Sequence, residues 1–112
     1  MALFLIIEPH EDIRRLYAAV VRGLGHEAAF FNGLPVAHPQ VVLVEPAQAE
    51  SLEAALLLQR DNPGLPIVCA SIDGPNGGTR RLEPVAHLVK PFALPDIEAA
   101  LTMALDARPV PA

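Results

Sequence analysis

Five short, mainly apolar runs alternate with polar or amphipathic stretches along the chain. The runs cover residues 3–7, 27–31, 41–44, 67–70 and 86–89. The first and third runs are apolar at every position, which is typical of strands buried on both faces in the centre of a parallel sheet. We therefore predict one strand in each run.

Three of the intervening stretches have helical periodicity and predict helices at residues 11–24, 51–60 and 95–107. Gly25 favours the end of the first helix, and Ser51 is a suitable N-cap for the second. The first and last helices each have one apolar face that is expected to pack in a core. The residues of these faces are Ile13, Leu16, Tyr17, Val20 and Leu24 in the first helix, and Ile97, Ala100, Leu101, Ala104 and Leu105 in the last.

Two connecting segments have little capacity to form a helix. Residues 34–39 contain two prolines and are expected to hold no more than one helical turn. Residues 73–78 (DGPNGG) are expected to form a loop without helix, and residues 79–83 one turn at most. The helices that would follow the second and fourth strands are therefore expected to be shortened or lost.

Strands that alternate with helices form a parallel sheet with helices on both faces. We expect an α/β fold with a five-stranded parallel sheet in a single domain of residues 1–106. The proline-rich residues 107–112 are expected to be a tail or the start of a linker. In open sheets of this kind the functional site lies at the carboxyl ends of the strands.

Composition narrows the classes of function. The 112-residue chain is 52% hydrophobic and 19% charged, as in a globular domain. Its formal net charge of −5 argues against direct nucleic-acid binding, which needs clustered basic residues. The N-terminal apolar run is too short to span a membrane. We therefore expect a cytoplasmic protein that makes no membrane contact.

The single cysteine, Cys69, lies within an apolar run. One cysteine supports neither a disulfide framework nor a zinc site. Because apolar surroundings raise the pKa of a thiol, we expect a buried, unreactive side chain. The histidines have no ligand spacing, so no metal site is assigned.

At least one polar side chain follows each of four of the five predicted strands. Glu8 and Pro9 follow the first, Glu45 the third, Ser71 the fourth and Lys90 the fifth. Two carboxylates, a hydroxyl and a lysine at one edge can bind a divalent cation and a phosphoryl group. They are equally expected as polar strand ends that face water, with the lysine paired to an acid and the serine capping a loop. Spacing alone leaves both interpretations open.

Four segments that contain these residues resemble the response-regulator receiver domain of two-component signalling. They are residues 6–15, 39–45, 65–71 and 87–92, and the last contains the family's Lys-Pro-Phe signature. The resemblance covers essentially the whole chain. It implies a flavodoxin-like (receiver-like) fold.

The resemblance also implies a role for each matched position. Glu45 stands where an aspartate accepts the phosphoryl group, and Glu8 and Pro9 stand where two acids form the magnesium-binding pocket. The remaining matches are the switch-equivalent residues Ser71 and His87, and Lys90 and Pro91 at the family's conserved lysine and the proline after it.

Two of these positions depart from the family. Pro9 has no side-chain oxygen for magnesium, and Glu45 is one methylene longer than aspartate. Magnesium binding is therefore expected to be lost or weak, no other cofactor is implied, and no catalytic residue is assigned. Glu45 is expected either to pair with Lys90 and imitate the phosphorylated state or to point into solvent.

The leading hypothesis is an atypical, or pseudo-, receiver domain of a two-component or phosphorelay protein. It would act as a phosphorylation-independent protein-interaction module and not as an enzyme. The expected partners are a signalling protein, a fused output domain or a second copy in a homodimer. The leucines at residues 56–58 cover more than one helix face, so they are expected either to form a broad core-facing stripe or to leave one leucine exposed for a partner. The alternatives are a functional receiver, phosphorylated with Mg²⁺ near Glu45, and a small-ligand-binding flavodoxin-like domain. The sequence lacks a glycine-rich phosphate loop after the first strand, which counts against a domain that binds a ligand such as a nucleotide.

Overall fold

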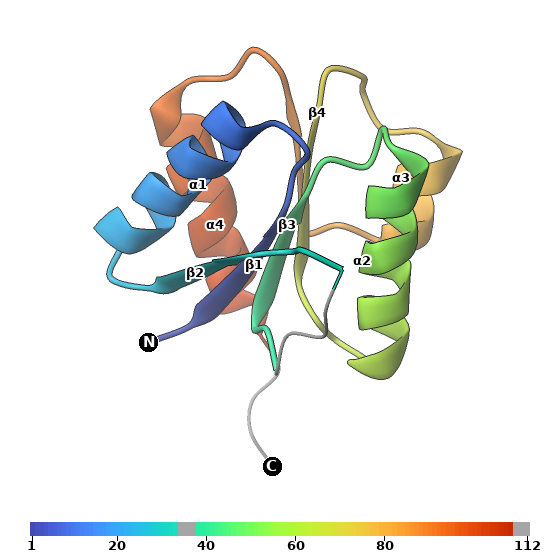
Figure 1. Ribbon diagram of the computed structural model, residues 1–112, viewed down its shortest axis with the longest axis horizontal. Helices are drawn as coiled ribbons and strands as arrows, with labels where there is room; N and C mark the ends of the chain where they lie inside the picture. The colour runs from blue at the N-terminus through green and yellow to red at the C-terminus, as the bar shows by residue number, and fades with distance from the viewer. Residues whose placement is uncertain (34–37, 109–112) are drawn as a thin grey trace.

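A computed structural model describes residues 1–33 and 38–108 of the chain. All five predicted strands are present and form one parallel sheet in the order β2-β1-β3-β4-β5 (Figure 1). The strands are β1 (Leu3–Ile7), β2 (Glu27–Phe30), β3 (Val41–Val44), β4 (Ile67–Ser71) and β5 (Ala86–Val89).

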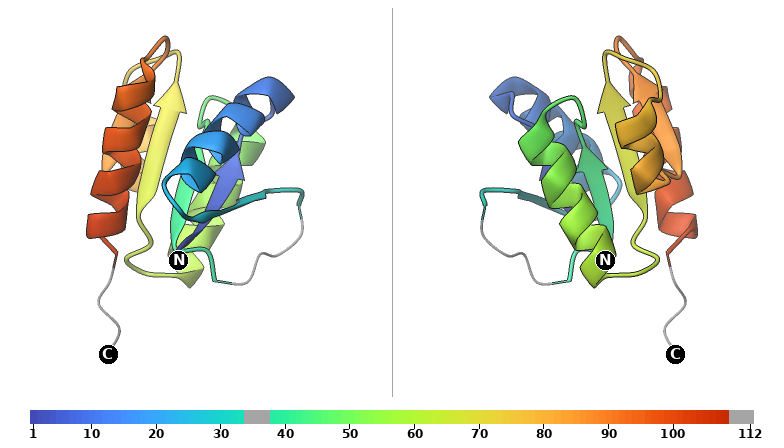
Figure 2. Two further views of the ribbon diagram at one scale, coloured as in Figure 1. Left: turned by 90° about the vertical axis from the view of Figure 1, so that its left-hand side faces the viewer. Right: turned by 90° about the vertical axis from the view of Figure 1, so that its right-hand side faces the viewer.

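Four helices cover the sheet in the described part of the chain. They are α1 (Glu11–Gly23), α2 (Ala49–Asp61), α3 (Gly77–Leu82) and α4 (Leu94–Asp106). Helices α1 and α4 lie on one face of the sheet, and α2 and α3 lie on the other (Figure 2). The expected α/β, flavodoxin-like arrangement is confirmed.

Alternating side chains of the sheet pack into two separate hydrophobic cores. Phe4 and Ile6 of β1 belong to the core under α1 and α4, whereas Leu5 and Ile7 belong to the core under α2 and α3. Every residue of β3 and β4 is buried, because helices cover both faces of these central strands. The carboxyl edge of the sheet is therefore anchored on both sides.

The predicted core faces of α1 and α4 are correct except at one position. Leu16 of α1 is 44% exposed, because it lies toward the groove between α1 and α4 and not over the sheet. The other residues of the two faces pack in the first core. The apolar face of α1 is therefore wider than the part that packs in the core, and Leu16 lies outside that part.

The prediction of Ser51 as the N-cap of α2 is wrong. The helix begins two residues earlier, at Ala49, and its N-cap is Gln48. Alanine and glutamate are good helix formers, so the helix extends into these positions and Ser51 becomes a buried residue of the first turn. Leu57 is 47% exposed, so of the two readings of the leucine run the exposed leucine is present and a wholly core-facing stripe is not.

The prediction of a loop through residue 78 is wrong at its end, because Gly77 and Gly78 form the first turn of α3. The Asn76 side-chain oxygen accepts hydrogen bonds from the N–H groups of Gly78 and Thr79 at 2.9 and 3.1 Å. The Thr79 hydroxyl in turn accepts one from the Asn76 N–H at 2.8 Å. This capping box offsets the low helix propensity of glycine. With 6 residues, against 13 in each other helix, α3 is shortened as expected.

The link between β2 and β3 and the C-terminal tail are partly described. Residues 31–33 and 38–40 form no helix, and residues 34–37 of the predicted short link lie outside the described residues. Helix α4 ends at Asp106, and residues 109–112 of the predicted tail also lie outside the described residues. Within the described residues, no helix has the length and apolar character needed to cross a membrane.

Candidate functional site

Side chains from the ends of three strands meet at one ammonium group. Lys90 follows β5 and places Nζ 3.0 Å from Glu8 Oε1 and 3.3 Å from Glu45 Oε2. Because β4 lies between β3 and β5, the lysine side chain reaches past the end of β4. The two acids and the lysine that the sequence predicts at one edge are therefore in direct contact.

These three charges are largely shielded from water. The side chain of Glu8 is fully buried, that of Glu45 is 6% exposed and that of Lys90 is 23% exposed. Charges at such depth are stable only when they are paired and hydrogen-bonded. The expectation of a lysine paired to an acid is confirmed, and the expectation of Glu45 in solvent is wrong. The contact on which a phosphate mimic would depend is present.

Backbone N–H groups just beyond the strands hold both carboxylates. Glu45 Oε1 accepts a hydrogen bond from the Ala47 N–H at 2.8 Å, and Glu8 Oε2 accepts one from the His10 N–H at 3.2 Å. The Nδ1 atom of the His10 ring also lies 3.2 Å from Glu8 Oε2. Each loop therefore folds around the acid that begins it. Pro9, between Glu8 and His10, is exposed.

The side chains of Ser71 and His87, which the resemblance implies to be switch-equivalent, both contact the backbone of Asp73. Ser71 Oγ accepts a hydrogen bond from the Asp73 N–H at 3.2 Å, so the serine caps the loop after β4. His87 Nε2 lies 3.1 Å from the Asp73 carbonyl oxygen, and His87 Nδ1 is buried without a partner among the described residues. Ser71 and His87 therefore form a second cluster, next to the cluster of Glu8, Glu45 and Lys90 and separate from it.

Tyr17 of α1 belongs to the surroundings of the carboxylates, although the sequence indicates only a core position. Its ring stacks on Phe92, with centroids 6.5 Å apart and planes at 18°. Burial raises the pKa of the hydroxyl, and the charges of Glu8 and Glu45 raise it further. The hydroxyl is buried and has no hydrogen-bond partner among the described residues. A tyrosine on a core face is itself the missed signal, because a buried hydroxyl needs a partner.

Cys69 of β4 is buried, as the sequence predicts. Burial, with a smaller effect of the Glu45 charge, raises the pKa of its thiol to about 12. Because the thiolate is the reactive form, we expect the folded protein at pH 8 to resist 5,5′-dithiobis(2-nitrobenzoate), whereas the urea-unfolded chain reacts rapidly. The absorbance of the released thionitrobenzoate measures both rates. Equal rates for folded and unfolded protein would contradict the buried, protonated thiol.

A pocket of about 420 Å³ opens at Glu45 and Lys90. Its lining is mainly apolar but includes the charged side chains of Glu45 and Lys90. The pocket also includes Ile72, which the sequence analysis does not assign to the site and which is 72% exposed. Such a pocket can bind a group that combines hydrogen-bonding atoms with hydrocarbon. The lining residues are His10, Ile13, Glu45, Ala47, Gln48, Ile72 and Lys90.

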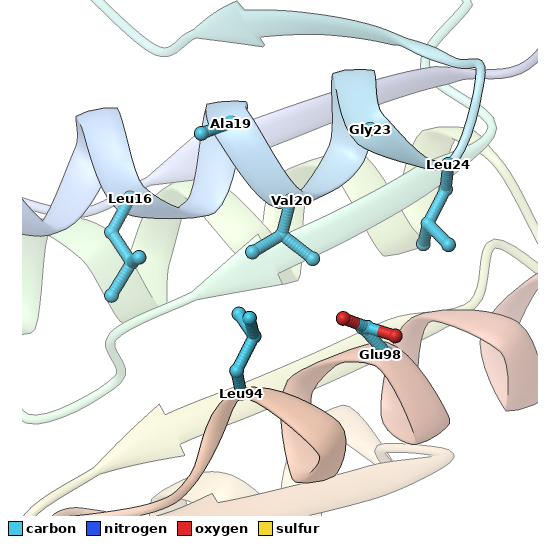
Figure 3. Close-up of a pocket in the computed structure, with 7 residues that line it drawn as sticks. All are labelled: Leu16, Ala19, Val20, Gly23, Leu24, Leu94 and Glu98. Atoms are coloured by element: carbon cyan, nitrogen blue, oxygen red, sulfur yellow. The ribbon is translucent and has the colours of Figure 1, made fainter.

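A second groove of about 380 Å³ lies between α1 and α4. Leu16 and Val20 of α1, and Leu24 just after it, point toward Leu94 and Glu98 of α4 (Figure 3). Leu16 is 44% exposed and Leu94 is 51% exposed, so the groove leaves apolar surface in contact with water.

The sequence matches no family model and no curated protein sequence. Solved structures match over nearly the whole chain. A CheY-like response-regulator receiver domain from Methanospirillum hungatei JF-1 has a TM-score of 0.81 at 13% identity, over 95% of this chain and 94% of that one. A response regulator from Thermotoga maritima has a TM-score of 0.79 at 11% identity, over 95% and 98% of the two chains.

A third solved structure belongs to a longer protein. NtrX from Brucella abortus, solved in complex with ATP, has a TM-score of 0.78 at 24% identity. The match covers 95% of this chain and 27% of that one. Likenesses at these identities establish the fold. The chain has the receiver-domain fold of two-component response regulators.

Proposed function

We propose that this chain is an atypical receiver domain that acts in two-component or phosphorelay signalling as a cytoplasmic protein-interaction module, without phosphorylation and without enzymatic activity. One observation carries the proposal: the Lys90 ammonium group is hydrogen-bonded to both Glu8 and Glu45. The acids of the site thus have a cation that belongs to the chain itself.

Magnesium, which the receiver fold implies, does not fit the donor set of this chain. Mg²⁺ requires near-ideal octahedral coordination by oxygen. Pro9 offers no side-chain oxygen, and the ammonium group of Lys90 lies between the two remaining carboxylates. A magnesium ion would have to displace that ammonium group and would still lack a ligand.

The position of the phosphoacceptor supports the same proposal. Both oxygens of Glu45 already accept hydrogen bonds, one from the Ala47 N–H at 2.8 Å and one from Lys90 Nζ at 3.3 Å. The carboxylate is therefore held by the protein instead of being poised to attack a phosphoryl donor. Ser71 lies in a separate hydrogen bond to the Asp73 N–H.

A module of this kind needs a partner, which we propose to be a signalling protein, an output domain fused to the chain or a second copy. The exposed side chains of Leu57 and Leu94 provide apolar surface of the kind that partner proteins cover. A fused partner agrees with NtrX, since the match covers only 27% of that protein.

The second candidate is a functional receiver, favoured by the open pocket through which a phosphoryl donor can reach Glu45 and Lys90. NMR of the ¹⁵N-labelled domain with Mg²⁺ and beryllofluoride, a mimic of the phosphoryl group, separates the two. We expect no saturable shifts near Glu45 and Lys90, because magnesium lacks ligands and the lysine is already paired.

A further inference from the structure

We propose that the pocket beside Glu45 binds a cationic side chain, an arginine or a lysine, presented by a partner protein. This inference rests on the proposed function, because a partner's cation can enter only a site that does not hold magnesium and phosphate. It names the chemistry of the partner and the place of contact.

The charges of the site favour a cation. Glu8 and Glu45 contribute two negative charges and Lys90 one positive charge, so the group carries −1 when His10 is neutral. A buried charge without a counter-ion is costly. A second cation would remove that imbalance, whereas an anion such as phosphate would increase it.

Unused hydrogen-bonding capacity also faces the pocket. An ionised carboxylate has about four acceptor sites, and each oxygen of Glu45 accepts one hydrogen bond. Glu45 lines the pocket, so its remaining lone pairs can accept N–H groups that enter from solvent.

The apolar walls determine what kind of cation fits. Ile13, Ala47 and Ile72 line the same pocket as Glu45 and Lys90, and Ile72 is 72% exposed. A free metal ion would leave this hydrocarbon in water, and an apolar ligand would leave the charge unbalanced. The methylene stem and cationic head of arginine or lysine match both features.

The test uses N-acetyl-arginine-N′-methylamide as the probe and the uncharged citrulline analogue, which has nearly the same shape, as its control. Each is titrated into the ¹⁵N-labelled domain at pH 7 and low ionic strength, where screening is weak. We expect shifts confined to the amides of Ile13, Ala47 and Ile72. We expect the arginine probe to bind about tenfold more tightly than the citrulline analogue, as for a charge-assisted hydrogen bond.

Two variants sharpen the result. Glu45→Gln makes the group neutral and should abolish the preference for arginine, whereas Glu53→Gln, on the exposed face of α2, changes the net charge equally and should preserve it. Equal binding of the two probes by the unsubstituted domain, or shifts located elsewhere, would overturn the inference even if Glu45→Gln fails to fold. If beryllofluoride binds near Glu45, the proposed function fails. If neither beryllofluoride nor arginine binds, only this inference fails.

Discussion

Replacing Lys90 with methionine should destabilise the folded domain by about 3 kcal/mol, near the lower end of the range for breaking a buried ion pair. The lower end applies because the lysine side chain is 23% exposed. The substitution keeps most of the hydrocarbon stem but leaves Glu8 and Glu45 facing each other without a cation. Urea unfolding at pH 7, followed by circular dichroism, measures the change.

Two further variants show whether the lost charge is the cause. Arg60→Met removes an exposed cation from α2 and should change the unfolding midpoint little. The triple variant Glu8→Gln/Glu45→Gln/Lys90→Met carries no net charge at the site and should recover much of the loss. If Lys90→Met is as stable as Arg60→Met, the proposed role of the lysine as the counter-ion of both acids is wrong.

Leu82→Ala should destabilise the domain by about 3 kcal/mol, because removing a buried leucine side chain leaves a cavity. Leu82 is fully buried in the core under α2 and α3, and its carbonyl oxygen accepts a hydrogen bond from Gln59 Nε2. The short helix α3 would thus be an integral part of the cooperative fold. Thermal or urea unfolding measures the loss.

Leu57→Ala is the matched control, since Leu57 lies on α2 and is 47% exposed. Its loss should be about 0.5 kcal/mol, as for most surface substitutions. Similar losses for Leu57→Ala and Leu82→Ala would mean that α3 does not pack as described.

The strands and the long helices can be predicted because burial dictates their pattern. Residues 41–44 are apolar at every position since β3 lies between two strands and under helices on both faces. Helix α3 escapes prediction because its stability comes from the Asn76 capping box and the burial of Leu82, which together outweigh two glycines. Such tertiary and capping effects are invisible to local propensity.

The sequence likewise predicts which residues of the candidate site lie together, but not how all of them are oriented. Glu8, Glu45 and Lys90 are expected together because the carboxyl ends of parallel strands meet at one edge. The sequence cannot say which of two open orientations Glu45 adopts, since that depends on the loop that brings the Ala47 N–H to its carboxylate. The lack of a partner for the Tyr17 hydroxyl among the described residues likewise depends on the three-dimensional positions of neighbouring polar atoms.

The most direct test of a phosphorylation-independent site is the response of the ¹⁵N-labelled domain to Mg²⁺ and beryllofluoride. The Pro9→Asp/Glu45→Asp variant restores an acid at position 9 of the magnesium pocket and an aspartate at the phosphoacceptor position 45. It serves as the control that is expected to respond. We predict saturable shifts around positions 45 and 90 in that variant and none in the unsubstituted domain. Saturable shifts around Glu45 and Lys90 in the unsubstituted domain would contradict the account.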